Sequence, residues 1–172
     1  IQWCDHTLKS HEFKDYAPNG LQIEGDAEVN KILCAVTASQ DAIEAAIEQG
    51  ANLLLVHHGY FWKGEPYPIT GMRGKRIKRL IQHDISLLAY HLPLDSHPTL
   101  GNNASIADLL ELENIEVLDP SERHPIGNIG YLKQPMSATD FKHYVSTRLK
   151  FDVTHLTAEK ASIQKIGYCT GG

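Results

Sequence analysis

Short apolar runs that alternate with amphipathic segments are the feature that most constrains the fold of this chain. The apolar runs are rich in strand-forming residues and cover residues 31–38, 52–56 and 85–90. The segments that follow them place apolar residues at helical spacing, over residues 40–49, 74–83 and 103–112. Strands that are apolar on both faces and separated by helices form a parallel sheet covered by helices. The sequence therefore predicts an α/β fold with a mostly parallel sheet.

A cluster of breakers between Asp119 and Asn128 suggests a boundary, because it contains two prolines and a glycine. We expect a first lobe over residues 1–118 and the start of a second lobe over residues 119–172. Further strands are expected at residues 129–133, 151–156 and 163–169, with a helix that opens at Ser137. Because the last strand runs directly into Gly171 and Gly172, we expect further residues beyond the end of this chain.

Charge and hydrophobicity argue against a nucleic-acid binder, a membrane protein and a secreted protein. The net charge of -5 argues against a nucleic-acid binder, which normally carries a basic patch. The basic residues between Arg73 and Arg79 fit a solvated helix face better than a binding site. The longest apolar run, Ile32–Val36, is too short to cross a membrane, and no secretory signal is visible.

The cysteines agree with a reducing environment. Their number is odd and they form no C-x-x-C pair, so neither a disulfide framework nor a zinc ribbon is expected. Buried reduced thiols and a cytoplasmic location fit this usage.

His57 and His58 carry the strongest chemical signal. They close an expected strand and precede Gly59, and ligand sites of parallel sheets form at the carboxyl ends of strands. Regular alternation would point the two side chains to opposite faces, but it can relax where the chain leaves the sheet. A hydrogen-bonded histidine pair in a loop is the alternative interpretation.

A second cluster follows the next expected strand and contains His91, Asp95 and His97. It leaves the same edge of the sheet as the histidine pair. Asp95 can bridge two cations through its two oxygens, although a turn or helix cap is the alternative. Because no cysteine joins these residues, a nitrogen and oxygen ligand set is expected, which suits Zn²⁺, Mn²⁺, Fe²⁺ or Ni²⁺.

The turn at residues 101–103 opens a predicted helix. Asn102 or Asn103 is expected to cap it. The backbone N–H groups at the start of the helix offer a place for an anion such as a substrate phosphate, and a plain turn with a cap is the simpler interpretation.

Several long motifs make the chain similar to a known family, the YbgI-like or Nif-three-like proteins, which commonly carry the name GTP cyclohydrolase I type 2 homolog. The motifs are YAPNGLQIEG (16–25), VTAS (36–39), LLLVHHGYFW (53–62), YHLPLDSHPTLGNN (90–103) and GYCTGG (167–172). The resemblance covers nearly the whole chain. It implies two related α/β lobes, a dinuclear metal centre and a ring-shaped homohexamer with the metal sites facing an interior cavity.

The resemblance also assigns residues. It implies that His57, His58 and Asp95 bind the two divalent metal ions. It leaves His91, His97 and Asn102 as groups that support these ligands or contact substrate. It further implies that a histidine and a glutamate from a segment after Gly172 complete the ligand set.

Two functions remain open from the sequence. The first is a metal-dependent hydrolase that uses a metal-bound water on a small molecule, with a nucleotide or purine ring as the suggested substrate. The second is a non-catalytic regulatory or scaffold protein that uses the metals to hold a ligand or brace the assembly. An open coordination position on the metals would favour the first.

Overall fold

The computed structural model describes residues 1–156 and 162–170. The chain forms two compact units, residues 1–94 and 95–172. Each unit is described by itself. The division into lobes after residue 118 stays a prediction, because a compact unit need not coincide with a lobe that folds by itself.

The first unit contains the parallel sheet that the sequence predicts. Its helices are α1 (Gln2–Leu8), the short 3₁₀ helix η1 (Ser10–Glu12), α2 (Gln40–Glu48) and α3 (Gly71–Gln82). Its strands are β1 (Gly20–Ile23), β2 (Ile32–Thr37), β3 (Leu53–His58) and β4 (Ser86–Ala89). The sheet order is β1-β4-β3-β2. Strands β2, β3 and β4 run parallel, and β1 joins the edge in the antiparallel direction.

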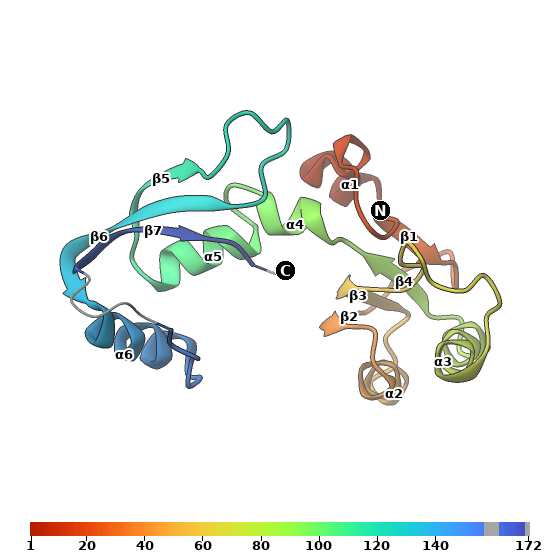
Figure 1. Ribbon diagram of the computed structural model, residues 1–172. Helices are drawn as coiled ribbons and strands as arrows, with labels where there is room; N and C mark the ends of the chain where they lie inside the picture. Colours follow the sequence, from red (N-terminus) through yellow and green to blue (C-terminus); the bar gives the residue numbers. More distant parts are fainter. Residues whose placement is uncertain (157–161, 171–172) are drawn as a thin grey trace. The chain divides into compact units, whose positions relative to one another are not determined.

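The two faces of this sheet bury different residues, because side chains alternate along a strand. On one face, Leu54 and Val56 of β3 pack in a core with α2 and α3. On the other face, Leu53 belongs to a smaller cluster with Leu8 of α1. Helices α2 and α3 therefore lie together on one side of the sheet and α1 lies on the other (Figure 1).

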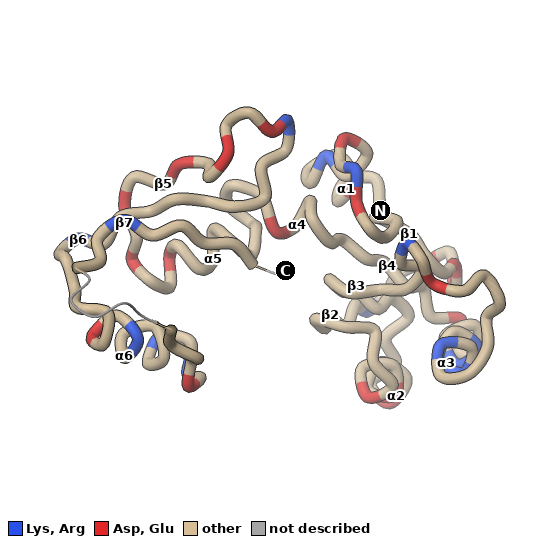
Figure 2. The backbone as a smooth tube through the Cα atoms, in the orientation of Figure 1, with Lys and Arg blue, Asp and Glu red and all other residues tan. Residues whose placement is uncertain are grey.

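Helices α2 and α3 carry opposite charges. Acidic residues gather on α2 and basic residues on α3 (Figure 2). The Arg79 guanidinium donates to both carboxylate oxygens of Glu44, at 2.9 and 2.6 Å. The basic stretch of α3 is therefore partly a helix-pairing surface, whereas Lys75 and Lys78 are exposed to solvent as predicted.

The second unit has a different sheet. Helix α4 (Leu92–Ser96) contains the junction between the units. The remaining elements are α5 (Asn102–Leu109), β5 (Glu113–Val117), β6 (Asn128–Ser137), α6 (Ala138–Leu149) and β7 (Ser162–Tyr168). The sheet order is β5-β6-β7 and every pairing is antiparallel. The α/β class is confirmed, and the mostly parallel arrangement belongs to the first unit.

Three predictions that concern the second unit are wrong. Cys169, like Cys34 of the first unit, is exposed rather than buried. Residues 151–156 form no strand, because Phe151 and Leu156 are exposed to solvent and no neighbouring strand pairs with them in the described chain. Neither Asn102 nor Asn103 caps α5, which begins after Gly101 without a side-chain cap. The predicted cap at Ser137 is confirmed, since its side chain accepts from the Asp140 N–H.

No helix in the described part of the chain combines the length and the apolar character that crossing a membrane requires.

Candidate metal site

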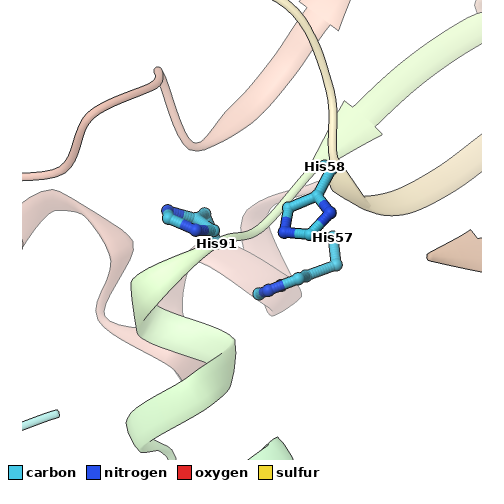
Figure 3. A group of neighbouring side chains, drawn as sticks. All are labelled: His57, His58 and His91. Atoms are coloured by element: carbon cyan, nitrogen blue, oxygen red, sulfur yellow. The ribbon is translucent and has the colours of Figure 1, made fainter. Parts of the chain in front are cut away.

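Three histidines come together at the carboxyl edge of the first sheet. His57 and His58 end β3, and His91 follows the neighbouring parallel strand β4. One nitrogen from each ring lies within 4.8 Å of the other two. The three rings face one another at the tips of the two strands (Figure 3). Among the described residues, no other group of histidines, cysteines and carboxylates meets this spacing.

The chain fixes which nitrogen carries the lone pair in two of the rings, those of His57 and His91. The Nδ1 atom of His57 lies 2.9 Å from the carbonyl oxygen of Tyr90. A carbonyl only accepts, so Nδ1 carries the hydrogen and the lone pair of the neutral ring is at Nε2. The Nδ1 atom of His58 lies 3.3 Å from the Thr37 hydroxyl, on the adjacent strand β2.

A buried carboxylate orients the third ring. The Nδ1 atom of His91 donates to Asp15 at 2.7 Å, and only 3% of the Asp15 side chain is exposed. Burial raises the pKa of Asp15, but hydrogen bonds from His91, from Asn19 and from two backbone N–H groups outweigh it and hold the pKa below 3.8. Asp15 is therefore charged at neutral pH, and it places the lone pair of His91 at Nε2.

This donor set fits a divalent cation. Metal-bound histidines in proteins usually donate their second ring nitrogen to a carboxylate or a backbone carbonyl, and His57 and His91 do so here. Tetrahedral ligands at about 2.1 Å from zinc lie about 3.4 Å apart, so the spacing within 4.8 Å needs only small ring movements. Nitrogen donors suit the first-row metals that the sequence suggested.

The loop after β3 packs closely around the rings. A Cβ atom at Gly59 would lie 2.9 Å from the Cβ of Ala89, so a larger residue has no room there. The ring of Trp62 meets His91 edge-on, with centroids 4.9 Å apart. Phe61 has a φ of 66°, a backbone conformation that residues other than glycine adopt rarely. Such outliers often accompany binding sites.

Asp95 lies in the second unit, in helix α4, and is 1% exposed. Its Oδ1 atom accepts from the Asn102 side chain at 2.8 Å and from the Thr170 hydroxyl at 2.9 Å. Asn103 accepts from the backbone N–H of Thr170 at 2.8 Å, which fixes that residue. A carboxylate held this firmly is preorganised, as metal ligands are. Its role as a ligand stays a prediction.

The other predicted residues have local roles. The Nδ1 atom of His97 accepts from the backbone N–H of Leu100 at 3.0 Å, so this ring caps the turn before α5. Asn102 donates a hydrogen bond to Asp95 at 2.8 Å, and its part in a metal site stays a prediction.

Sequence reasoning missed Asp15, Asn19 and Thr170. Asp15 lies 76 residues before His91, and nothing in its local pattern distinguishes it from a surface aspartate. The YAPNG turn at residues 16–20 was the nearest signal, because Asn19 within it accepts from the backbone N–H of His91 at 2.8 Å.

Comparison with known proteins agrees with the resemblance read from the motifs. The family model described as Duf34/NIF3 (NGG1p interacting factor 3) matches residues 1–172. Two proteins named GTP cyclohydrolase 1 type 2 homolog are similar over almost the whole chain. The Vibrio cholerae protein is 48% identical over 98% of this chain and 67% of its own length. The Haemophilus influenzae protein is 49% identical, over 99% and 68%.

Solved structures share the fold. A structure described as protein ybgI, of unknown function, superposes with a TM-score of 0.90 at 41% identity, over 99% of this chain and 68% of that one. The protein TTHA1606 from Thermus thermophilus has a TM-score of 0.74 at 32% identity, over 88% and 60%. Because the family model matches residues 1–172, the chain belongs to the Duf34/NIF3 family.

Proposed function

We propose that this protein is a dinuclear metal-dependent hydrolase that acts on a nucleotide or a purine ring. The observation that carries the proposal is the convergence of His57, His58 and His91 within ligand distance of one another. Two of these rings have Nδ1 committed to an acceptor of the protein itself. The name shared by the relatives, GTP cyclohydrolase 1 type 2 homolog, is the source of the suggested substrate.

Each residue has a defined role in this proposal. The three histidines would hold the metals, and His57 and His91 would do so through Nε2. Asp95 supplies a carboxylate, which Asn102 and Thr170 hold in one orientation. Asp15 sets the ring orientation of His91 and balances the positive charge that builds up at the site. Divalent cations bound there would lower the pKa of water toward neutrality and so supply a hydrolytic nucleophile.

Metal content measured by inductively coupled plasma mass spectrometry tests the site. The intact protein, purified after growth with added zinc, manganese, iron or nickel, is expected to hold about two ions per chain. His57→Ala/His58→Ala removes two nitrogen donors and is expected to abolish retention. Asp95→Asn is expected to reduce it, because a neutral amide binds cations more weakly than a carboxylate.

A matched control is His6→Ala, which changes an exposed histidine of α1 in the same unit. It is expected to keep the metal content of the unchanged protein. Full retention by the double variant would refute the site. Metal-dependent turnover of a nucleotide panel tests the reaction separately, and a metal-loaded protein without turnover would favour the regulatory or scaffold function.

We also propose that the protein forms a homohexamer, as its resemblance to the YbgI-like proteins implies. Exposed apolar residues on β2, the edge strand of the first sheet, support association between chains. Ile32 and Val36 are both exposed there, and an unpaired edge strand readily joins another chain.

A further inference from the structure

The side chain of Gln22, on β1, links two segments that border the candidate metal site. Its Oε1 atom accepts from the backbone N–H of Tyr60 at 2.7 Å, and its Nε2 atom donates to the carbonyl oxygen of Pro18 at 2.8 Å. Tyr60 lies in the loop that follows β3. Pro18 precedes Asn19, which accepts from the backbone N–H of His91 at 2.8 Å. One amide therefore connects the loop after the histidine pair with the turn that holds His91.

The backbone ladder between β3 and β4 ends before it reaches His58. Its last paired residues are Val56 and Ala89, and the N–H of Tyr90 still donates to the carbonyl oxygen of Val56 at 3.0 Å. His58 itself pairs on its other side, with β2. The rings of His58 and His91, whose centroids lie 5.6 Å apart (Figure 3), therefore stand on backbone segments that this ladder does not join.

The loop after β3 is held firmly where Gln22 meets it. Tyr60 is 6% exposed, and its hydroxyl donates to the carbonyl oxygen of Ala38 at 2.7 Å. A Cβ atom at Gly59 would lie 2.2 Å from the Gln22 Oε1 atom, so the amide packs directly against the backbone of the loop. A shift of this amide would therefore move the backbone next to the histidine pair.

The turn at the other end of the link is also held. Asn19 donates to Asp15 at 2.9 Å, and Asp15 in turn accepts from the His91 ring at 2.7 Å. A second link joins the same two segments, because the backbone N–H of Lys63 donates to the carbonyl oxygen of Tyr16 at 2.6 Å. The turn therefore carries the position of the loop to the backbone and the ring of His91.

We infer that Gln22 is a positioning residue, whose amide holds the rings of His58 and His91 at the spacing that metal binding needs. It touches no ligand atom and acts through the backbone at both ends. Ligands work only when they are held within about 0.5 Å of the required geometry, so loss of the link lowers metal affinity while every ligand stays in place. The inference rests on the metal site of the proposed function and is independent of the reaction.

Two variants of the intact protein separate hydrogen bonding from packing. Gln22→Met keeps the length of the side chain but neither accepts from Tyr60 nor donates to Pro18. Gln22→Glu keeps the acceptor and loses the donor. Titration with Co²⁺ against a competing chelator is expected to show affinity about tenfold lower in Gln22→Met, with a smaller loss in Gln22→Glu. The visible absorption of bound Co²⁺, which depends on the geometry of its ligands, is expected to change in Gln22→Met.

The spacing of the rings is also measured without metal. Nuclear Overhauser contacts between the ring protons of His58 and His91 are expected in the metal-free protein and are expected to weaken in Gln22→Met. The matched control, Gln82→Met, changes an exposed glutamine at the end of α3 in the same unit. It is expected to leave the Co²⁺ affinity, the absorption and the ring contact unchanged.

The inference would be overturned by a Gln22→Met protein that keeps the Co²⁺ affinity, the absorption and the ring contact of the unchanged protein. An equal loss of affinity in Gln82→Met would overturn it as well. A failure of the proposed function gives a different result, because the unchanged protein then binds no Co²⁺. In that case a weaker ring contact in metal-free Gln22→Met still supports the positioning role, and an unchanged contact still refutes it.

Discussion

Asp15 joins the start of the chain to the candidate metal site. It contacts His91 across 76 residues of sequence, and it also accepts from the backbone N–H of Leu92 at 2.9 Å. One oxygen therefore orients a ring, and the other fixes the backbone that follows that ring. The carboxylate supports both the site and the local fold.

Asp15→Asn tests both roles, because metal affinity and stability of the metal-free protein are measured separately. The amide nitrogen would meet donors that now point at a carboxylate oxygen, and His91 would lose its charged acceptor. We expect metal affinity to fall about 10- to 100-fold, as at other sites where a group holding a metal ligand is changed. We expect the metal-free protein to lose about 1–3 kcal/mol of stability. Competition with a chelator and thermal unfolding measure the two effects.

Asp26→Asn is the control for this change, because Asp26 is an exposed aspartate in the same unit. It is expected to alter neither quantity. Unchanged metal affinity in Asp15→Asn would show that His91 keeps its orientation without the carboxylate.

At the scale of elements, α2 and α3 combine a buried contact with an exposed one. Ile43 and Leu80 pack in the same core, while Glu44 and Arg79 meet at the helix surface at 2.6 Å. The hydrogen bond from Arg79 lowers the pKa of Glu44 to about 2, with Gln40 adding a second donor. This pair makes helix association depend on pH.

The sign of that dependence follows from the direction of the shift. Because the folded state lowers the pKa of Glu44 from 4.5 to about 2, the pair stabilises the fold above pH 4.5 and its contribution is lost as the pH falls toward 2. Glu44→Gln is expected to be less stable than the unchanged protein at pH 7, and the difference is expected to disappear as the pH falls below 2. Chemical denaturation across this range, with an NMR titration of Glu44, measures both. A stability difference that stays as large below pH 2 as at pH 7 would contradict this account.

At the scale of the whole molecule, the molar mass in solution tests the proposed homohexamer. Light scattering after size exclusion is expected to give six times the mass of one chain. The mass should hold on dilution, because obligate interfaces are large and apolar. A mass equal to one chain at micromolar concentration would refute the assembly.

Sequence predicted the parts of this molecule that depend on local pattern. The parallel strands and their helices follow from apolar periodicity, and His57 and His58 fall at a strand end for the same reason. The prediction of a strand at residues 151–156 was wrong, because strand-forming residues make a strand only where a partner strand pairs with them.

The supporting contacts of the site could not be predicted in the same way. Asp15 meets His91, and Thr170 meets Asp95, across more than seventy residues of sequence. Such pairs depend on how distant segments pack, and a single sequence carries no pattern for them. Residue pattern and family resemblance both pointed to Asp95 as a candidate ligand, whereas the structure showed that Thr170 helps to hold its carboxylate.

The strand tips that carry His57 and His91 have one further consequence. Parallel pairing between β3 and β4 sets the spacing of these imidazoles through the backbone ladder of the sheet, about 4.8 Å from strand to strand. The loop that carries Trp62, which packs on His91, lies outside that ladder. That loop can therefore vary in sequence, and with it the surroundings of the rings, while the imidazole spacing stays constant.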